Sequence, residues 1–219
     1  DIESKEQETG GVIRLNHLMV YAAPTSISAA FREFAEVAGL NMTGIGFTRD
    51  SVYSAVKNTF ADGLHMLVKI EFDSTSISII KDGDLALQRN INYGVDSAIE
   101  TVRAFPQFGE NLSQQEALMV LHDRRCLKDS LNGIDTSDMD TQDQLLENAK
   151  MEVTESFRYM VGNISRIMDY YISRNTDATF SSIQICGLGA GIKGVRRLLA
   201  NELAQRVEVV YALDKYTYP

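Results

Sequence analysis

The chain has 219 residues, a hydrophobic fraction of 44% and a formal net charge of −9, with a pI of about 4.9. This is the balance of a globular protein that can bury the core of one large domain or two small ones. The acidic balance disfavours nucleic acid and anionic lipid as partners because it repels phosphate groups, and no apolar run approaches the length of a membrane span.

The first 62 residues predict part of a small α+β subdomain and a connecting helix. Strands are expected over 12–23, which Pro24 ends, and over 41–47. Between them, Thr25 or Ser26 is expected to cap a helix that runs through Ala38 and ends at Gly39. A short helix over about 49–58 follows, and Asp62-Gly63 marks the boundary.

Residues 63–219 predict an α/β domain. Three strands are expected at 65–71, 76–80 and 85–91, with a hairpin turn at 81–84. Helices follow at 95–105 and 113–123, the second opened by a capping box of Ser113 and Glu116. The remaining expected elements are an exposed loop over 127–141, a long helix over about 142–172, a strand over 182–186, a helix over 191–204 and a strand over 208–211.

The strand over 182–186 runs into a glycine cluster, Gly187, Gly189, Gly191 and Gly194. Glycines at such a turn let the backbone approach a ligand closely, since no Cβ stands in the way. The helix that opens there would offer unpaired N–H groups to a nucleotide or another polar ligand. A tight strand–helix junction without a ligand explains the same glycines equally well.

The order of these elements is that of one half of an actin-like ATPase, and four stretches are similar to known motifs. They are Val20-Tyr21-Ala22-Ala23-Pro24 with Val37-Ala38-Gly39-Leu40, the run 68–79 with Arg89-Asn90-Ile91-Asn92-Tyr93-Gly94, the run 152–159, and the glycine cluster. Together they resemble the PilM family of type IV pilus assembly proteins and, more distantly, the FtsA family of cell-division proteins. No single stretch is specific, but the four occur in the right order.

The resemblance implies an actin-like, RNase H-like fold with a mixed sheet over 63–219, preceded by a partial inserted α+β subdomain over 1–62. It also implies three parts of a nucleotide site. The second phosphate loop would be Asp73, Ser74 and Thr75; the ribose side would be Glu152 and Ser156; and the adenosine motif would be Gly187, Leu188 and Gly189. An ordinary hairpin turn at 73–75 and a solvated helix face at Glu152 are the alternatives.

The chain departs from the family pattern where phosphate would bind. Lys69 and Glu71 stand where the family has an aspartate and a glycine, so Glu71 would bring a side chain into the phosphate space. Strand alternation places Lys69 and Glu71 on one face, where they can partly neutralise each other. The first phosphate loop of the family lies upstream of this chain, which begins at Asp1 and is expected to be a fragment. We therefore expect no ATP hydrolysis and no catalytic residue, with ATP and magnesium bound at most by a longer parent protein.

The function that the resemblance implies is a cytoplasmic scaffold. It would bind the cytoplasmic tail of a PilN-type inner-membrane protein through residues 12–47, with self-association possible. An active ATPase and an FtsA-type filament protein are the alternatives. The two cysteines, Cys126 and Cys186, and the three histidines have neither metal-ligand nor catalytic spacing, so we expect no metal site and no disulfide framework.

Overall fold

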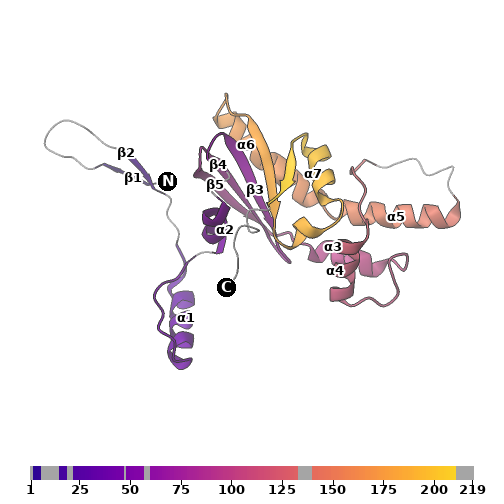
Figure 1. The fold of residues 1–219 in the computed structure, drawn as a ribbon, viewed down its shortest axis with the longest axis horizontal. Coiled ribbons are helices and arrows are strands. Elements are labelled where there is room, and N and C mark those ends of the chain that lie inside the picture. The colour runs from indigo at the N-terminus through magenta and orange to yellow at the C-terminus, as the bar shows by residue number, and fades with distance from the viewer. Residues whose placement is uncertain are drawn as a thin grey trace. The chain divides into compact units, whose positions relative to one another are not determined.

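The computed structural model describes residues 2–5, 15–18, 22–46, 48–56, 60–132 and 140–210. The chain forms two compact units, Asp1–Thr48 and Arg49–Pro219 (Figure 1). The division at Thr48 lies earlier than the predicted boundary at Asp62-Gly63. The short helix α2 (Thr48–Val56) therefore falls almost wholly in the second unit.

The first unit contains a two-stranded ribbon and one helix. Strands β1 (Ile2–Lys5) and β2 (Leu15–Leu18) pair antiparallel, with Ile2 opposite Leu18. Helix α1 (Thr25–Val37) follows, and Gly39 ends it with a φ of +68°, a conformation that favours glycine. The strand predicted over 12–23 is thus seen at 15–18, while Ala22 and Ala23 are not in a strand and its other positions lie outside the described residues.

Two predictions for the first unit are wrong. Thr25 does not cap α1, because it already lies in the helix and Pro24 precedes it without a side-chain cap. Residues 41–46 form no strand, and position 47 lies outside the described residues. Gly44 and Gly46 weaken the strand preference of this segment. In addition, the amide of Leu40 donates to the carbonyl of Ala35 in α1 (2.8 Å), so it is not available for pairing with a strand.

The second unit is built on a five-stranded mixed sheet in the order β5-β4-β3-β6-β7. Strands β3, β4 and β5 pair antiparallel, while β6 and β7 extend the sheet in parallel from β3. Their bounds are β3 Leu64–Ile70, β4 Thr75–Lys81, β5 Asp84–Ile91, β6 Phe180–Cys186 and β7 Val207–Val209. The predicted strands are confirmed to within a few residues, as is the hairpin turn, in which Asp82 and Gly83 have positive φ angles.

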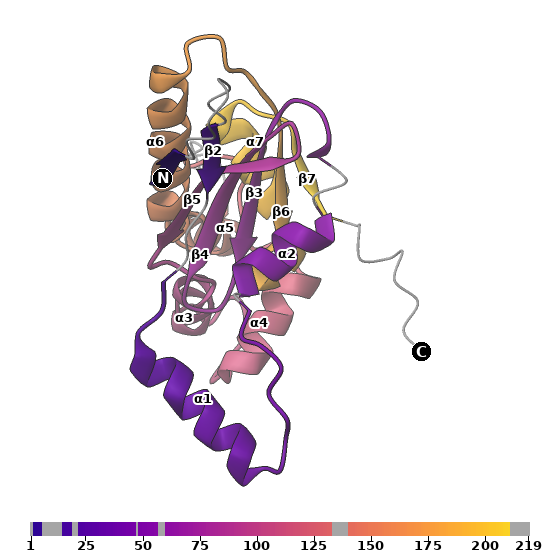
Figure 2. The same ribbon diagram turned by 90° about the vertical axis from the view of Figure 1, so that its left-hand side faces the viewer.

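The two faces of the sheet are covered differently. On one face, alternate residues of β3 (Met66, Val68 and Ile70) join the large core beneath the helices. On the other face Leu67 packs with Val56 at the end of α2 in a small apolar cluster. Figure 2 shows α2 in front of the strands, with α6 (Arg158–Arg174) and α7 (Val195–Leu203) behind them.

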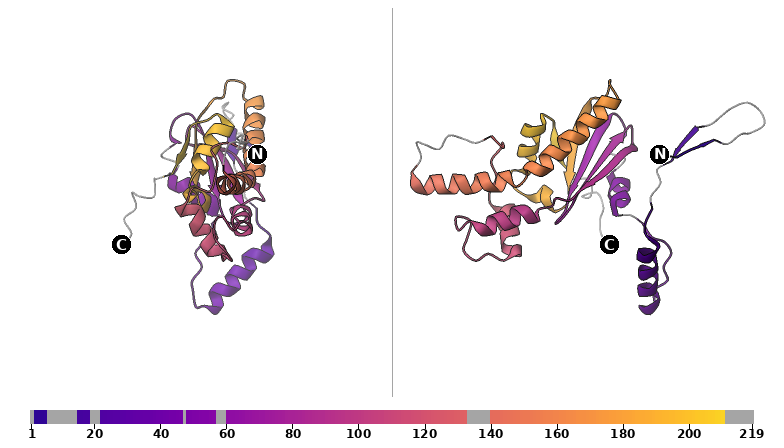
Figure 3. Two further views of the ribbon diagram at one scale, coloured as in Figure 1. Left: turned by 90° about the vertical axis from the view of Figure 1, so that its right-hand side faces the viewer. Right: turned by 180° about the vertical axis from the view of Figure 1, so that it is seen from behind.

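Helices α3 (Asp96–Ala104) and α4 (Gln114–Asp123) follow the sheet as predicted. Ser113 and Glu116 form the predicted capping box, since each side chain accepts from the backbone amide of the other. The predicted long helix is instead two helices, α5 (Thr141–Glu155) and α6, which change direction at Ser156 and Phe157 (Figure 3). The Ser156 hydroxyl donates to the carbonyl of Val153 (2.7 Å), a local bond that competes with the helix ladder.

Two further predictions for this unit need correction. The loop predicted to be exposed over 127–141 has buried anchors, because Leu127 and Leu131 are in the core; residues 133–139 lie outside the described residues. Helix α7 begins at Val195, four residues later than predicted, after a short 3₁₀ turn over Leu188–Gly191. No helix in the described ranges is long and apolar enough to span a lipid bilayer.

Candidate nucleotide site

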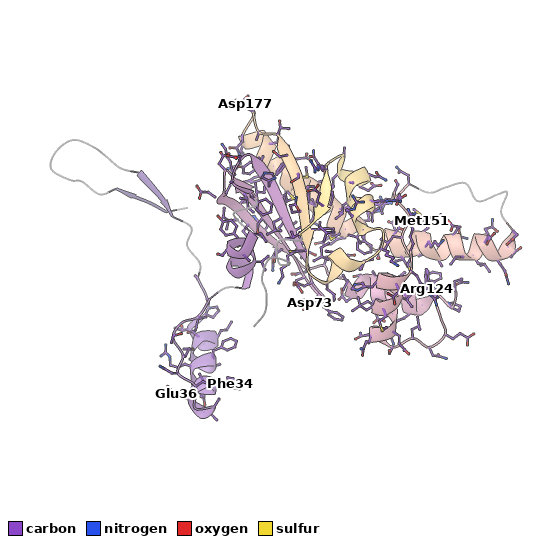
Figure 4. All side chains as sticks on the ribbon, viewed as in Figure 1. Phe34, Glu36, Asp73, Arg124, Met151 and Asp177 are labelled. Carbon is purple, nitrogen blue, oxygen red and sulfur yellow. The ribbon has the colours of Figure 1, made fainter. Side chains whose placement is uncertain are left out.

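The carboxyl ends of β3 and β6 lie side by side at one edge of the sheet, because these strands are parallel neighbours with Lys69 opposite Cys186. The turn after β3 and the glycine turn after β6 therefore leave the sheet together. Figure 4 labels Asp73 at this end of the sheet and Asp177 at the other end. In open α/β sheets, ligands bind outside the carboxyl ends of the strands.

The turn between β3 and β4 is short and closed. The amide of Glu71 donates to the carbonyl of Ser74 (2.9 Å), and the Ser74 hydroxyl donates to the carboxylate of Asp73 (3.1 Å). Asp73 is exposed and Ser74 is half-buried. These residues form the ordinary hairpin turn that the sequence left open as an alternative, and a phosphate role for them stays a prediction.

Backbone hydrogen bonds from the start of α3 fix the turn after β3. The amides of Val95 and Asp96 donate to the carbonyls of Glu71 and Phe72 (3.0 and 2.9 Å). A Cβ at position 94 would lie 2.0 Å from the carbonyl oxygen of Phe72, so only glycine allows this approach. Gly94 and the helix start thus fix the backbone at the end of β3.

Thr75 faces the protein interior. Its side chain is fully buried, and its hydroxyl donates to the carbonyl of Tyr93 (2.9 Å) and lies 3.9 Å from the sulfur of Met160. The ring of Tyr93 packs on Phe157, with centroids 5.9 Å apart. In this arrangement the Thr75 hydroxyl is occupied within the core, and its predicted contact with phosphate would require that bond to break.

The Tyr93 hydroxyl is buried, and no hydrogen bond of normal geometry satisfies it among the described residues. Burial, as the main cause, raises the pKa of Tyr93; the nearby Ser156 side chain lowers it in part, and the charge of Asp96 adds to the increase. From the sequence, neither Tyr93 nor Asp96 was assigned a role. Asp96 could have been recognised because it is an aspartate at the first position of a helix, directly after Gly94-Val95.

The predicted ribose residues lie at the junction of α5 and α6. Glu152 is exposed and forms no ion pair within the described ranges, while its carbonyl accepts from the amide of Ser156 (3.1 Å). Glu155, which replaces a basic residue of the family pattern, pairs with Arg158. Among the described residues no hydrogen bond joins Glu152 to either turn, so its approach to a ribose stays a prediction.

A charged pair occupies the space between the two turns. Lys69 Nζ lies 2.7 Å from Glu71 Oε1, with the two side chains 21% and 39% exposed, which confirms that they share a face. The same Glu71 oxygen is 3.1 Å from the position that a Cβ on Gly187 would take. Two like charges about 4 Å apart repel by roughly 1 kcal/mol in water, and by more in a partly dry cleft. A triphosphate placed at this end of the sheet would therefore meet the carboxylates of Glu71 and Asp73.

Packing restricts the positions of the glycines after β6. Gly187 has a φ of +82°, and a Cβ there would lie 2.5 Å from the carbonyl oxygen of Ile70. A Cβ at Gly189 would lie 2.4 Å from Cγ2 of Ile70, and one at Gly191 would lie 3.1 Å from the ring of His122. Neighbouring protein atoms thus explain these glycines without a ligand, although they do not exclude one.

The backbone amides of this turn are partly used within it. The amides of Ala190 and Ile192 donate to the carbonyls of Gly187 and Gly189 (3.1 and 3.2 Å). The carbonyl of Leu188 lies 3.2 Å from Nε2 of His122, which explains that histidine as a packing residue. Helix α7 begins at Val195, so its first amides adjoin Gly194, the last glycine of the cluster, and lie after the 3₁₀ turn over Leu188–Gly191.

The described residues contain no group of three histidine, cysteine, aspartate or glutamate side chains that could hold a metal ion. Cys126 and Cys186 are both free, and burial raises the pKa of each thiol to about 11. The thiols are therefore protonated at neutral pH and poor nucleophiles. This edge of the sheet therefore offers a ligand a backbone of fixed conformation, the ion pair of Lys69 with Glu71, and the carboxylate of Asp73.

Comparison with known proteins gives the class of fold. No family model and no curated protein matches the chain. Among solved structures, the PilM-PilN type IV pilus biogenesis complex aligns with a TM-score of 0.63 and 16% identity, over 87% of this chain and 49% of that one. MreB5 of Spiroplasma citri bound to ADP aligns with a TM-score of 0.56 and 15% identity, over 87% of this chain and 62% of that one. The MamK filament aligns with a TM-score of 0.55 and 12% identity, over 90% and 66%.

The protein therefore has the fold of actin-like ATPases, as predicted. The chain spans between about half and two thirds of the length of these solved structures. At such low identity the likeness defines the fold alone, and the choice among pilus assembly, filament formation and nucleotide turnover rests on the site.

Proposed function

We propose that this chain is part of an actin-like scaffold protein of type IV pilus assembly or a related secretion machine. In this proposal it works at the inner face of the cell membrane by holding the cytoplasmic tail of a PilN-type partner. The observation that supports the proposal is the Lys69–Glu71 ion pair at the end of β3, where the resemblance places bare backbone for phosphate. In this proposal the pair hinders phosphate at that edge, and the chain acts by binding proteins rather than by turnover.

The likeness to the PilM-PilN complex supports a partner of this kind, because that structure joins the same fold to another assembly protein. A surface suited to an apolar peptide exists on α1. Ile27, Phe31, Phe34 and Val37 are all at least half exposed, and a hollow of about 530 Å³ is lined by residues of the same helix. Figure 4 labels Phe34 and Glu36 on α1. Apolar side chains repeated along one helix face are a common way to bind a partner segment.

Partner binding is tested with the tail peptide of a neighbouring inner-membrane protein, measured by fluorescence anisotropy. We expect binding that Phe31→Ser with Phe34→Ser weakens at least tenfold, because these rings supply exposed apolar area. Glu33→Gln with Glu36→Gln on the same helix is the control and should change affinity less than twofold. Absence of binding to any such tail would contradict the scaffold proposal.

Nucleotide binding is tested by isothermal titration of the full-length protein with Mg·ATP, together with an assay of phosphate release. We expect no turnover and weak or no binding. Replacing Glu71 by glycine should increase affinity, because it removes a carboxylate beside the turn after β3 and leaves the ammonium group of Lys69 without its partner. Micromolar affinity with turnover in the unmodified protein would contradict the proposal.

An actin-like filament protein is the alternative that the other relatives favour, since the MamK structure is a filament and the MreB5 structure contains ADP. Sedimentation of the protein with and without Mg·ATP distinguishes the two. Pelleting that depends on nucleotide would favour the filament. A soluble protein that binds the tail peptide would favour the scaffold.

A further inference from the structure

A basic surface stands out on this acidic chain where α4 ends and α7 begins. Two hollows of about 330 and 280 Å³ adjoin there, and both are lined by Arg125. Figure 4 labels Arg124, the preceding residue, at the end of α4. We call this surface the basic groove, and its cations are Arg125, Lys128, Lys150, Lys193, Arg196 and Arg197.

The fold holds the groove in a fixed shape. The amide of Lys193 donates to the carbonyl of Leu121 at the end of α4 (3.1 Å). Gly194 has a φ of +107°, and a Cβ there would lie 3.2 Å from the side chain of Leu127. The side chain of Asn201 on α7 donates to the carbonyl of Asp129 (2.7 Å). The loop after α4 and the start of α7, which carry most of these cations, are therefore packed closely together.

The carboxylates of the groove do not balance its cations. Asp129 is shared by Arg125 (2.5 Å) and Arg197 (4.0 Å). Glu147 is likewise shared by Lys150 and Lys128. Among the described residues, these are the two acids that line the hollows, and they face six cations. The described part of the lining thus carries an excess of four positive charges on a chain whose net charge is −9.

The remaining two cations are available to a ligand. Lys193 Nζ donates to a main-chain carbonyl, that of Asp123 (2.5 Å), so its charge is not neutralised. Arg196 is exposed and forms no ion pair within the described part of the chain, although its charge contributes to lowering the pKa of Glu208. Arg196 and Arg197 also occupy the first turn of α7, which has neither an acid nor a side-chain cap. Cations are disfavoured at this end of a helix, and a bound anion would relieve the conflict.

We propose that the basic groove binds an acidic segment of a partner protein, through carboxylate side chains that engage Arg196, Arg197 and Lys193. Asp129 already shows how the groove holds a carboxylate between two guanidinium groups. The forked donors of arginine match the two oxygens of a carboxylate. The net negative charge of the chain opposes long polyanions that extend beyond the groove, such as nucleic acid and anionic membranes, more than it opposes a short acidic segment. This surface is on the second unit and does not depend on the tail-binding role proposed for α1.

The groove is tested with a fluorescently labelled octaglutamate peptide, whose anisotropy is followed as the 219-residue chain is added in 50 mM salt. We expect saturable binding that weakens as the salt concentration rises. Arg196→Glu with Arg197→Glu should reduce the affinity at least tenfold. Arg32→Glu with Arg89→Glu changes the net charge equally at exposed arginines outside the groove, and should reduce it less than threefold.

Thermal melts of both double variants establish that each is folded before affinities are compared. Failure of octaglutamate to bind would overturn the proposal, as would an equal loss in the control variant. Tighter binding of an oligonucleotide or of anionic vesicles than of the peptide, lost in the Arg196 and Arg197 variant, would show that the groove serves a phosphate-bearing partner and would also overturn it.

Discussion

Two turns at the same edge of the sheet differ in what determines their residues. The glycine turn after β6 is surrounded by protein atoms, so that positions 187, 189 and 191 each leave little or no room for a Cβ. The turn after β3 has its backbone fixed, but Glu71 and Asp73 extend toward solvent. Packing against the core therefore determines the residues of the glycine turn. The turn after β3 can carry any side chain that is compatible with exposure to solvent.

This comparison explains how an edge of this fold can keep its backbone shape while its exposed side chains vary. The glycine turn cannot change without disturbing the core, with or without a nucleotide. The positions that would face phosphate carry no such constraint, and there the chain has a lysine–glutamate pair. A glycine-rich turn in this fold is therefore weak evidence for nucleotide binding, and the residues beside it are the stronger test.

The largest expected effect comes from Gly187→Ala. The new Cβ would meet the carbonyl of Ile70 in a backbone conformation with positive φ, so the free energy of unfolding should fall by about 3 kcal/mol. Urea denaturation followed by circular dichroism measures it. Gly162→Ala is the control, since no atom lies within 4 Å of a Cβ there and α6 should gain about 0.5–1 kcal/mol. Equal results for the two variants would contradict the packing explanation.

Thr75→Val should have the next largest effect. It removes the donor to the buried carbonyl of Tyr93 and should lower the free energy of unfolding by about 1–2 kcal/mol. Thr75→Ser keeps the donor and should restore most of the loss that is due to the hydrogen bond. If valine is tolerated without loss, the hydroxyl does not act in the core and a ligand role becomes more plausible.

Glu71→Gln should change stability little, because its ion pair with Lys69 is partly exposed. We expect a loss below about 1 kcal/mol in the free energy of unfolding. The exposed Glu110→Gln provides a baseline for removing one negative charge. A loss as large as that of Gly187→Ala would show that the two turns do not differ in the way proposed.

The smallest expected effect is on the reactivity of Cys186. Burial raises the pKa of its thiol to about 11, while Lys69 lowers that pKa and Glu71 raises it. Glu71→Gln should therefore speed alkylation at pH 9 by roughly two- to threefold, and Lys69→Met should slow it. Cys126, whose pKa is also about 11, is an internal reference. Parallel changes at both thiols would indicate a general loosening of the structure.

Local patterns predicted much of the second unit. Alternating apolar residues in β3 and β4, the Asp82-Gly83 hairpin and the Ser113–Glu116 capping box are each determined by neighbours a few residues apart. The same alternation placed Lys69 and Glu71 on one face. These features follow from the sequence because their physical cause lies within one strand, one turn or one helix end.

Other features depend on contacts that no local pattern records. The hydroxyl of Thr75 is buried because Tyr93 and Met160 pack on it from later in the chain. The basic groove exists because the loop after α4 and the start of α7, some 70 residues apart in sequence, pack together at Gly194. Burial and charge density are properties of three-dimensional neighbours, so only the tertiary structure decided which predicted site residues are exposed to solvent and which face the core.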